Sequence, residues 1–266
     1  MTTISCMTAN YVARQLNYRM TSGWGQGDAA TQAFFRPLDT FAERFEDLLA
    51  EIADLGFEAI DLWLAHLHPT WATPDHIATA EALLGKFGLR VNSLAGSFGS
   101  THDEFAASCR LAVALGAPIL GGSTPLLASN RADVVALLEA HDLVLGYENH
   151  PEKNPAEVLA KIGGGVPGRI GVAIDTGWFG TQGYNAATAI VELSATLVYV
   201  HLKDVLAAGA HETCRYGHGI VPIAACVHAL QQIGYQGGIS VEHEPEHSNP
   251  NDDVRASLAL LQGLLA

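Results

Sequence analysis

The chain has 266 residues, 48% of them hydrophobic, and a formal net charge of −14 at pH 7. This length allows one large core, whereas the negative charge repels phosphate backbones and anionic lipid, which argues against nucleic-acid and membrane partners. No apolar span approaches the length of a transmembrane helix, and the N-terminal residues lack the basic and apolar regions of a signal peptide. We therefore expect one domain, residues 1–266, in a cytoplasmic protein.

Eight short β-like runs alternate with amphipathic helical runs. The predicted strands are Thr3–Ala9, Ala59–Trp63, Arg90–Leu94, Pro118–Gly121, Leu143–Glu148, Ile170–Asp175, Val198–Lys203 and Gly238–Glu242. Helical stretches such as 38–56, 102–116 and 222–234 have apolar residues at three-to-four spacing and end at a glycine. Eight β-then-α units predict a single (β/α)8 TIM barrel, an α/β fold whose active site lies at the C-terminal ends of the strands. The competing fold is an open doubly wound sheet, but its G-x-G-x-x-G fingerprint is missing.

Residues 12–36 interrupt this alternation. The stretch NYRMTSGWGQGDAATQAFF (17–35) is too long and glycine-rich for an ordinary loop after the first strand. Loops of such length within compact domains are usually functional lids or disordered. We expect residues 12–36 to form an insertion loop that serves as a lid.

The last four predicted strands end in potential metal ligands. Glu148 ends LVLGYE, Asp175 ends IGVAID, His201 lies in LVYVHLKD, and Glu242 ends GGISVE. Because the C-terminal ends of barrel strands meet at one mouth, these side chains should converge on one point. Glu244 lies on the same face as Glu242 but further from the barrel, so Glu242 is the expected ligand.

Alternation along the strands places all four ligands on the inward face. That face also carries small residues such as Gly146 and Gly171, and in the seventh strand Leu197 and Tyr199, whereas Val198 should face the helices. Two glutamates, an aspartate and a histidine form an oxygen-rich donor set with one imidazole. We expect one divalent ion, with Mn²⁺ or Mg²⁺ favoured and Co²⁺, Fe²⁺ or Zn²⁺ compatible.

Several motifs together resemble those of a known family. YENH, DTG, HLKD, G-x-G-I-x-P-I (217–223) and GYQGGISVEHE are similar to motifs of the xylose isomerase-like TIM-barrel superfamily, the sugar phosphate isomerase/epimerase group. The resemblance implies that Glu148, Asp175, His201 and Glu242 hold one divalent metal, and that Glu148 and Glu242 also act as acid and base. Many members have a histidine where this chain has Trp178, so the role of that histidine is not carried over.

Such a site suits proton abstraction next to the carbonyl of a keto-sugar or cyclitol. A metal stabilises the enediolate, while carboxylates remove and return the proton, each step typically contributing about 10²–10⁴-fold. Return of the proton to the other face gives epimerisation or isomerisation. Expulsion of a β-substituent would instead make the protein a dehydratase or β-eliminating lyase acting on an inosose or 3-keto-glycoside. The ligand set does not distinguish these reactions.

Five further side chains are candidate substrate contacts: His66, His150, Trp178, Lys203 and Arg215. Each has a structural alternative. His66 and Arg215 could be ordinary loop residues, and His150 could orient Glu148. Lys203 could pair with a ligand carboxylate, and Trp178 could be a core residue rather than an apolar wall for a sugar ring.

Two other protein classes remain open. An endonuclease IV-like phosphodiesterase would need more strand-end histidines, including the one replaced by Trp178, and a basic surface. A binding module would need no metal. Since no glycine-rich phosphate cradle follows the late strands, we expect a neutral carbohydrate substrate. The sequence leaves both a monomer and a homo-oligomer open.

Overall fold

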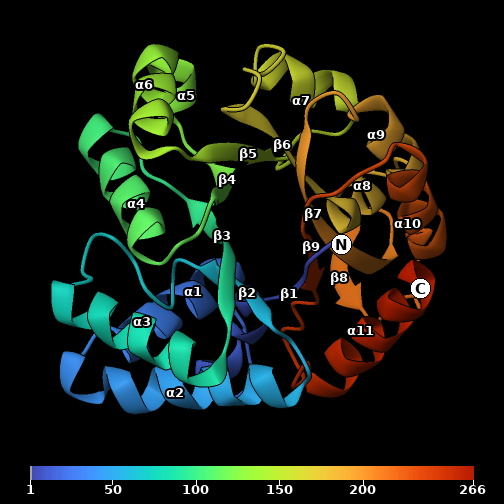
Figure 1. The fold of residues 1–266 in the computed structure, drawn as a ribbon. Helices are drawn as coiled ribbons and strands as arrows, with labels where there is room; N and C mark the ends of the chain where they lie inside the picture. Colours follow the sequence, from blue (N-terminus) through green and yellow to red (C-terminus); the bar gives the residue numbers. More distant parts are fainter. Residues whose placement is uncertain (1) are drawn as a thin grey trace.

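Eight parallel strands close into a barrel in the computed structural model, which describes residues 2–266 (Figure 1). The barrel strands are β1 (Ile4–Met7), β2 (Ala59–Trp63), β3 (Arg90–Ser97), β4 (Ile119–Ser123), β5 (Val144–Glu148), β6 (Ile170–Asp175), β7 (Leu197–Ala207) and β9 (Ile239–Glu242). Pairing of β6 with β7, β7 with β9 and β9 with β1 completes the ring. The predicted single (β/α)8 barrel is confirmed, although β3 and β7 run past their predicted ends.

Helices surround this barrel and bury their apolar faces against it. They are α1 (Trp24–Phe35), α2 (Leu38–Asp54), α3 (Pro74–Phe87), α4 (His102–Ala114), α5 (Leu126–Ser129), α6 (Arg131–His141), α7 (Pro155–Lys161), α8 (Thr176–Thr181), α9 (Ala186–Glu192), α10 (Ile223–Gln232) and α11 (Asn251–Leu265), with short 3-10 helices η1 (Thr8–Tyr11) and η2 (Arg14–Leu16) before them. In α2, Phe41, Phe45, Leu48 and Ile52 follow the helical period and are buried. Within residues 2–266, no helix combines the length and apolarity needed to cross a bilayer.

A β-bulge changes the interior of the barrel at β7. The register of β6 with β7 shifts around Val198, so this side chain points inward and Leu197 packs on the outer side. The Val198 methyl groups lie 2.5 and 3.1 Å from the positions that Cβ atoms would take at Gly171 and Gly146, so the two glycines leave the space that Val198 fills. The predicted facing of Leu197 and Val198 is therefore wrong, whereas Tyr199 points inward as predicted.

Residues 12–36 are folded rather than an irregular loop. After η2, the chain forms α1, which lies beside the end of β2 near the barrel mouth (Figure 1). Trp63 Nε1 donates to Asp28 Oδ1 at 2.8 Å, and the rings of Trp24 and Trp63 pack edge-on at 5.8 Å. These contacts explain why a glycine-rich stretch becomes helical, since tertiary packing overrides local propensity. A lid function for this segment stays a prediction.

The seventh barrel strand continues beyond the barrel and turns back as β8 (Ala210–Cys214), which pairs with it antiparallel. The turn contains Gly209 at a φ of 80°, in the left-handed region that favours glycine. The sequence analysis ended this strand at Lys203 and did not predict the hairpin. The hairpin adds a wall above one side of the barrel mouth.

Asp204 fixes the hairpin to the loop that follows it. Its carboxylate accepts hydrogen bonds from the backbone N–H groups of Val205, Gly217, Gly219 and Val221 at 2.9–3.0 Å. A Cβ at Gly219 would lie 2.2 Å from the carbonyl oxygen of Val205, so only glycine lets the loop approach this closely. The aspartate of HLKD and the glycines of G-x-G-I-x-P-I thus form one structural unit.

We predict that Asp204→Asn lowers the free energy of unfolding by about 2–3 kcal/mol, because an amide NH₂ would face backbone donors that a carboxylate accepts. Urea unfolding at neutral pH would measure the loss. Asp103→Asn, at an exposed aspartate in the first turn of α4, is the matched control and should change little. Equal stability of the two variants would contradict the role given to Asp204.

Candidate active site

The four predicted ligands lie at the C-terminal ends of neighbouring strands on one side of the barrel mouth. Glu148 ends β5, Asp175 ends β6, His201 lies in β7, and Glu242 ends β9, and all four are buried. Donor atoms of Glu148, His201 and Glu242 lie within 4.8 Å of one another, and so do those of Glu148, His150 and Asp175. The structure therefore brings three predicted ligands into one group and places Asp175 in a second group that shares Glu148.

His201 lies between the two glutamates. Its Nδ1 is 2.7 Å from Glu148 Oε1 and 3.5 Å from Glu242 Oε2. Burial acts to lower the pKa of His201, but the carboxylates of Glu148, Glu242 and Asp61 together outweigh burial and raise it to about 10. The ring has room because β4 has Gly121 at this level, where a Cβ would lie 3.3 Å from Nε2. The surroundings of Nδ1 thus favour positive charge.

The chemistry of this group fits a divalent cation. Glu242 Oε2 is buried and accepts no hydrogen bond from the described part of the chain, although it faces His201 Nδ1. Burial raises the pKa of Glu242 well above its ordinary value. Carboxylate oxygens and one imidazole nitrogen are the donors that Mn²⁺ or Mg²⁺ accepts in proteins. Glu148, His201 and Glu242 would hold the ion, and Asp175 is the fourth candidate ligand.

Lys203 neutralises several of the carboxylates. Its buried ammonium lies 3.1 Å from Asp175 Oδ2, 2.9 Å from Glu242 Oε1 and 2.8 Å from Glu244 Oε2. The Lys203 side chain passes close to Gly177. A Cβ at that position would lie 2.6 Å from Lys203 Cγ, which accounts for the glycine of DTG. Lys203 was predicted as a substrate contact, and in the structure it contacts three protein carboxylates.

Asp175 is held on both of its oxygens. Oδ2 accepts from Lys203 and, at 3.0 Å, from His150 Nε2, while Oδ1 accepts from the Trp178 backbone N–H at 2.9 Å and so caps α8. Burial works against ionisation, but the Lys203 ammonium together with His150 and His211 keeps the pKa of Asp175 well below its usual range. The Asn149 side chain also pairs with the backbone of Asp175 at 2.7 and 3.0 Å. Asp175 is therefore ionised and rigidly placed.

Trp178 lies at the edge of the candidate site, next to His150. Its indole packs edge-on against His150, with ring centroids 4.6 Å apart, and against His211 of β8 at 5.2 Å. Its Nε1 is buried and has no hydrogen-bond partner among the described residues. The indole thus borders the group formed by Glu148, His150 and Asp175.

Two predicted substrate contacts lie apart from this group. His66 is buried against Phe35, with centroids 5.0 Å apart, and shares a hydrogen bond with Thr8; burial lowers the pKa of His66 to about 3. Arg215 lies in the loop after β8, with its guanidinium 3.0 Å from His218 Nε2 and 3.9 Å from Asp253. The structure brings neither of them together with the four ligands.

Sequence analysis missed a polar layer inside the barrel beneath His201. Asp61 in β2 is fully buried and accepts hydrogen bonds from Ser93 at 2.7 Å and from Ser5 and Tyr199 at 2.5 Å each. The Tyr199 ring packs edge-on against His201 at 5.7 Å and so connects the layer to the site. The sequence feature that could have revealed this layer is an aspartate, Asp61, within the otherwise apolar strand β2. Asn149 was also missed, although it directly follows Glu148 in YENH.

Comparisons with known proteins agree with this architecture. The sequence model of the family described as xylose isomerase-like TIM barrel matches residues 49–264, and the chain belongs to this family. No curated protein sequence matches the chain significantly.

Solved structures resemble the chain at low sequence identity. A xylose isomerase domain protein from Planctomyces limnophilus is 21% identical, with a TM-score of 0.70, and the match covers 81% of this chain and 91% of that one. L-ribulose 3-epimerase is 17% identical with a TM-score of 0.71, covering 100% and 95%. The probable 3-DHS dehydratase AsbF from Bacillus anthracis is 14% identical with a TM-score of 0.67, covering 98% and 99%. At these identities the likeness establishes the fold.

We predict that Lys203→Met destabilises the metal-free protein by about 3–5 kcal/mol, because buried carboxylates lose the cation that compensates them. The side chain keeps its length, so the change tests charge more than packing. Unfolding by urea at pH 7 would measure the loss. Lys86→Met, at an exposed lysine paired with Glu46, is the control, and an equally small effect of both changes would refute the prediction.

Proposed function

We propose that the protein is a divalent-metal-dependent isomerase or epimerase that acts on a keto-sugar or cyclitol by abstracting a proton next to a carbonyl. The observation that carries this proposal is the pair of buried glutamates, Glu148 and Glu242, on either side of His201 Nδ1. Three ligands from three strands, with one carboxylate oxygen free of partners, form a site that a hydroxy-carbonyl substrate and a metal could share.

The charge balance supports a resident cation. Three carboxylates, those of Asp175, Glu242 and Glu244, contact one ammonium, that of Lys203, and the Glu148 carboxylate lies beside His201 Nδ1. Unpaired buried charge is strongly unfavourable, so a divalent ion is a natural way to offset the excess. Mn²⁺ is our first choice among the hard cations, with Mg²⁺, Co²⁺, Fe²⁺ and Zn²⁺ as alternatives. When bound, such an ion polarises the substrate carbonyl and stabilises charge that develops on oxygen.

Side chains of the site would then transfer the proton, contact the substrate and position the carboxylates. Glu148 and Glu242 stand on β5 and β9, so their carboxylates can reach opposite sides of a bound ring, one removing the carbon-bound proton and the other returning it. His150 and Trp178 border the same space and would contact the substrate ring. Lys203 would keep Asp175 ionised and hold both Asp175 and Glu242 in place.

A second candidate is a dehydratase or β-eliminating lyase acting on an inosose or 3-keto-glycoside. Both reactions begin with the same proton abstraction, and one structural neighbour carries the name of a dehydratase whereas others carry the names of 3-epimerases. The phosphodiesterase alternative is the least favoured, since the net charge of −14 opposes DNA binding and Trp178 stands where that reaction would need another histidine.

We predict that the protein binds one equivalent of Mn²⁺ and that His201→Ala weakens this binding by more than about 10-fold, because it removes an imidazole that lies next to both glutamates. Calorimetric titration and elemental analysis would measure affinity and stoichiometry, and circular dichroism would check the fold. His228→Ala, at an exposed histidine of α10, serves as the control. Unchanged affinity in His201→Ala would remove His201 from the site.

We predict that product formed in D₂O carries deuterium at the reacting carbon, and that Glu148→Gln or Glu242→Gln slows turnover by at least about 10²-fold. A panel of ketoses and inososes followed by NMR would provide the measurement, and an unsaturated or deoxy-keto product would identify the lyase. Glu139→Gln, at an exposed glutamate of α6, is the control. Unlabelled product formed without a primary isotope effect would rule out proton abstraction.

A further inference from the structure

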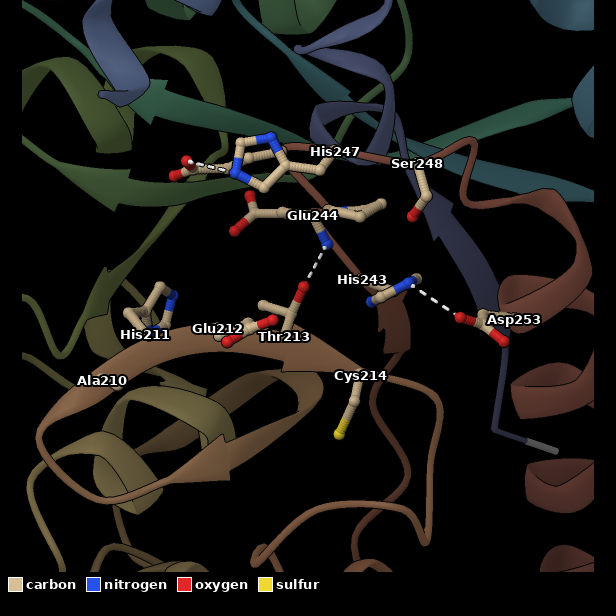
Figure 2. A pocket seen from close by; sticks show the side chains of 12 residues that line it. Ala210, His211, Glu212, Thr213, Cys214, His243, Glu244, His247, Ser248 and Asp253 are labelled. Carbon is tan, nitrogen blue, oxygen red and sulfur yellow. Dashed lines mark hydrogen bonds and ion pairs between the residues drawn. The ribbon is translucent and has the colours of Figure 1, made fainter. Parts of the chain in front are cut away.

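A cavity opens beside the candidate active site. It has a volume of about 430 Å³ and lies between β8 and the segment that follows β9, residues 243–248 (Figure 2). Its walls include His211 and Thr213 of the hairpin and His243, Glu244 and Ser248 of that segment. We call this cavity the hairpin pocket. Its size lies within the range of about 300–1,000 Å³ that is usual for small-molecule sites.

The hairpin pocket shares residues with the candidate active site. Glu244 lines the pocket, and its carboxylate binds Lys203, which also binds Asp175 and Glu242. On the other side, His211 lines the pocket and packs against Trp178, which packs against His150. The hairpin pocket therefore adjoins the candidate metal ligands through Lys203 on one side and through Trp178 on the other.

His243 in the pocket wall lacks hydrogen-bond partners for its side chain. The residue is only 2% exposed, and neither ring nitrogen makes a hydrogen bond within residues 2–266. The nearest charged atom is Asp253 Oδ2, 3.4 Å from Nε2 (Figure 2). Buried polar atoms normally have partners, and a ligand hydroxyl can both donate to and accept from an imidazole.

The charges around the pocket favour a neutral ligand. Four carboxylates line it, but Glu244 is paired with Lys203, and Asp253 lies near both His243 and Arg215. Among residues 2–266, no lysine or arginine lines the cavity, so an anion would lack a partner. The remaining lining groups are mainly hydroxyls, imidazoles and carboxylates, which suit the alternating donors and acceptors of a sugar ring.

We infer that the hairpin pocket binds the second, non-reacting ring of a neutral glycoside whose reacting ring lies at Glu148, His201 and Glu242. The placement of the reacting ring rests on the proposed function, whereas the binding of a neutral ring in the pocket does not. The inference narrows the substrate class from free monosaccharides to molecules with two linked polyhydroxylated rings.

A binding experiment without turnover tests the pocket directly. The probe is methyl β-D-glucopyranoside, a neutral ring with no carbonyl, added to the Mn²⁺-loaded protein and followed by saturation-transfer NMR. Ser248→Trp should fill the cavity, and His243→Phe should remove its unpartnered nitrogens. We expect each change to raise the Kd of the probe by at least about 10-fold, equivalent to 1.4 kcal/mol. Ser194→Trp, at an exposed serine away from the pocket, is the control and should leave the Kd unchanged.

Three results would overturn the inference: no binding of the probe, an unchanged Kd in Ser248→Trp, or tighter binding of the protonated 2-amino-2-deoxy analogue. The Mn²⁺ affinity of each variant, measured in parallel, separates a local effect from unfolding. If a ketose still exchanges deuterium while the probe fails to bind, only the pocket assignment fails. If Ser248→Trp abolishes probe binding but no ketose, inosose or keto-glycoside ever exchanges, the pocket stands and the proposed reaction fails.

Discussion

The buried ammonium of Lys203 is the interaction on which the candidate site depends. Asp175, Glu242 and Glu244 come from β6, from β9 and from the segment after β9, and each has a carboxylate oxygen within 3.1 Å of the same nitrogen. Without that cation, the strand ends would bring like charges together in a region with little water. The attraction is effective because the contacts are close and because Asp175 also accepts hydrogen bonds from His150 and from the Trp178 backbone. The lysine therefore sets which carboxylates stay available for a metal or substrate.

Two residues at the start of α8 make room for the Lys203 side chain and hold its backbone in place. Gly177 removes the Cβ that would collide with the Lys203 stem, and Thr176 exchanges hydrogen bonds of 2.8 Å with the Lys203 backbone. One residue later, Asp204 ties the strand to the loop at Gly217–Val221. The motif HLKD thus joins a candidate ligand, a buried cation and a loop anchor within four residues. Their spacing follows from the alternation of side chains in one strand.

Much of the fold followed from local pattern. Strand ends at Glu148, Asp175 and Glu242 were predictable because buried parallel strands read as apolar runs that stop at polar residues. The inward bulge at Val198 was not predictable, since it depends on space left by glycines on two neighbouring strands. Helix α1 was missed because its stability comes from contacts with Trp63 rather than from its own glycine-rich sequence. The sequence predicted that potential metal ligands meet at the barrel mouth. Which carboxylates contact Lys203 depends on the tertiary structure and could not be predicted in detail.

The anchoring of the hairpin by Asp204 also bears on how quickly a ligand could enter beside it. The Asp204 carboxylate accepts hydrogen bonds from four backbone N–H groups and so holds the loop, β8 and the end of β7 together. This wall of the pocket is therefore rigid. The opposite wall, residues 246–249, is exposed and has few side-chain contacts. Ligand entry would then depend on the segment after β9, whose movement would set the association rate.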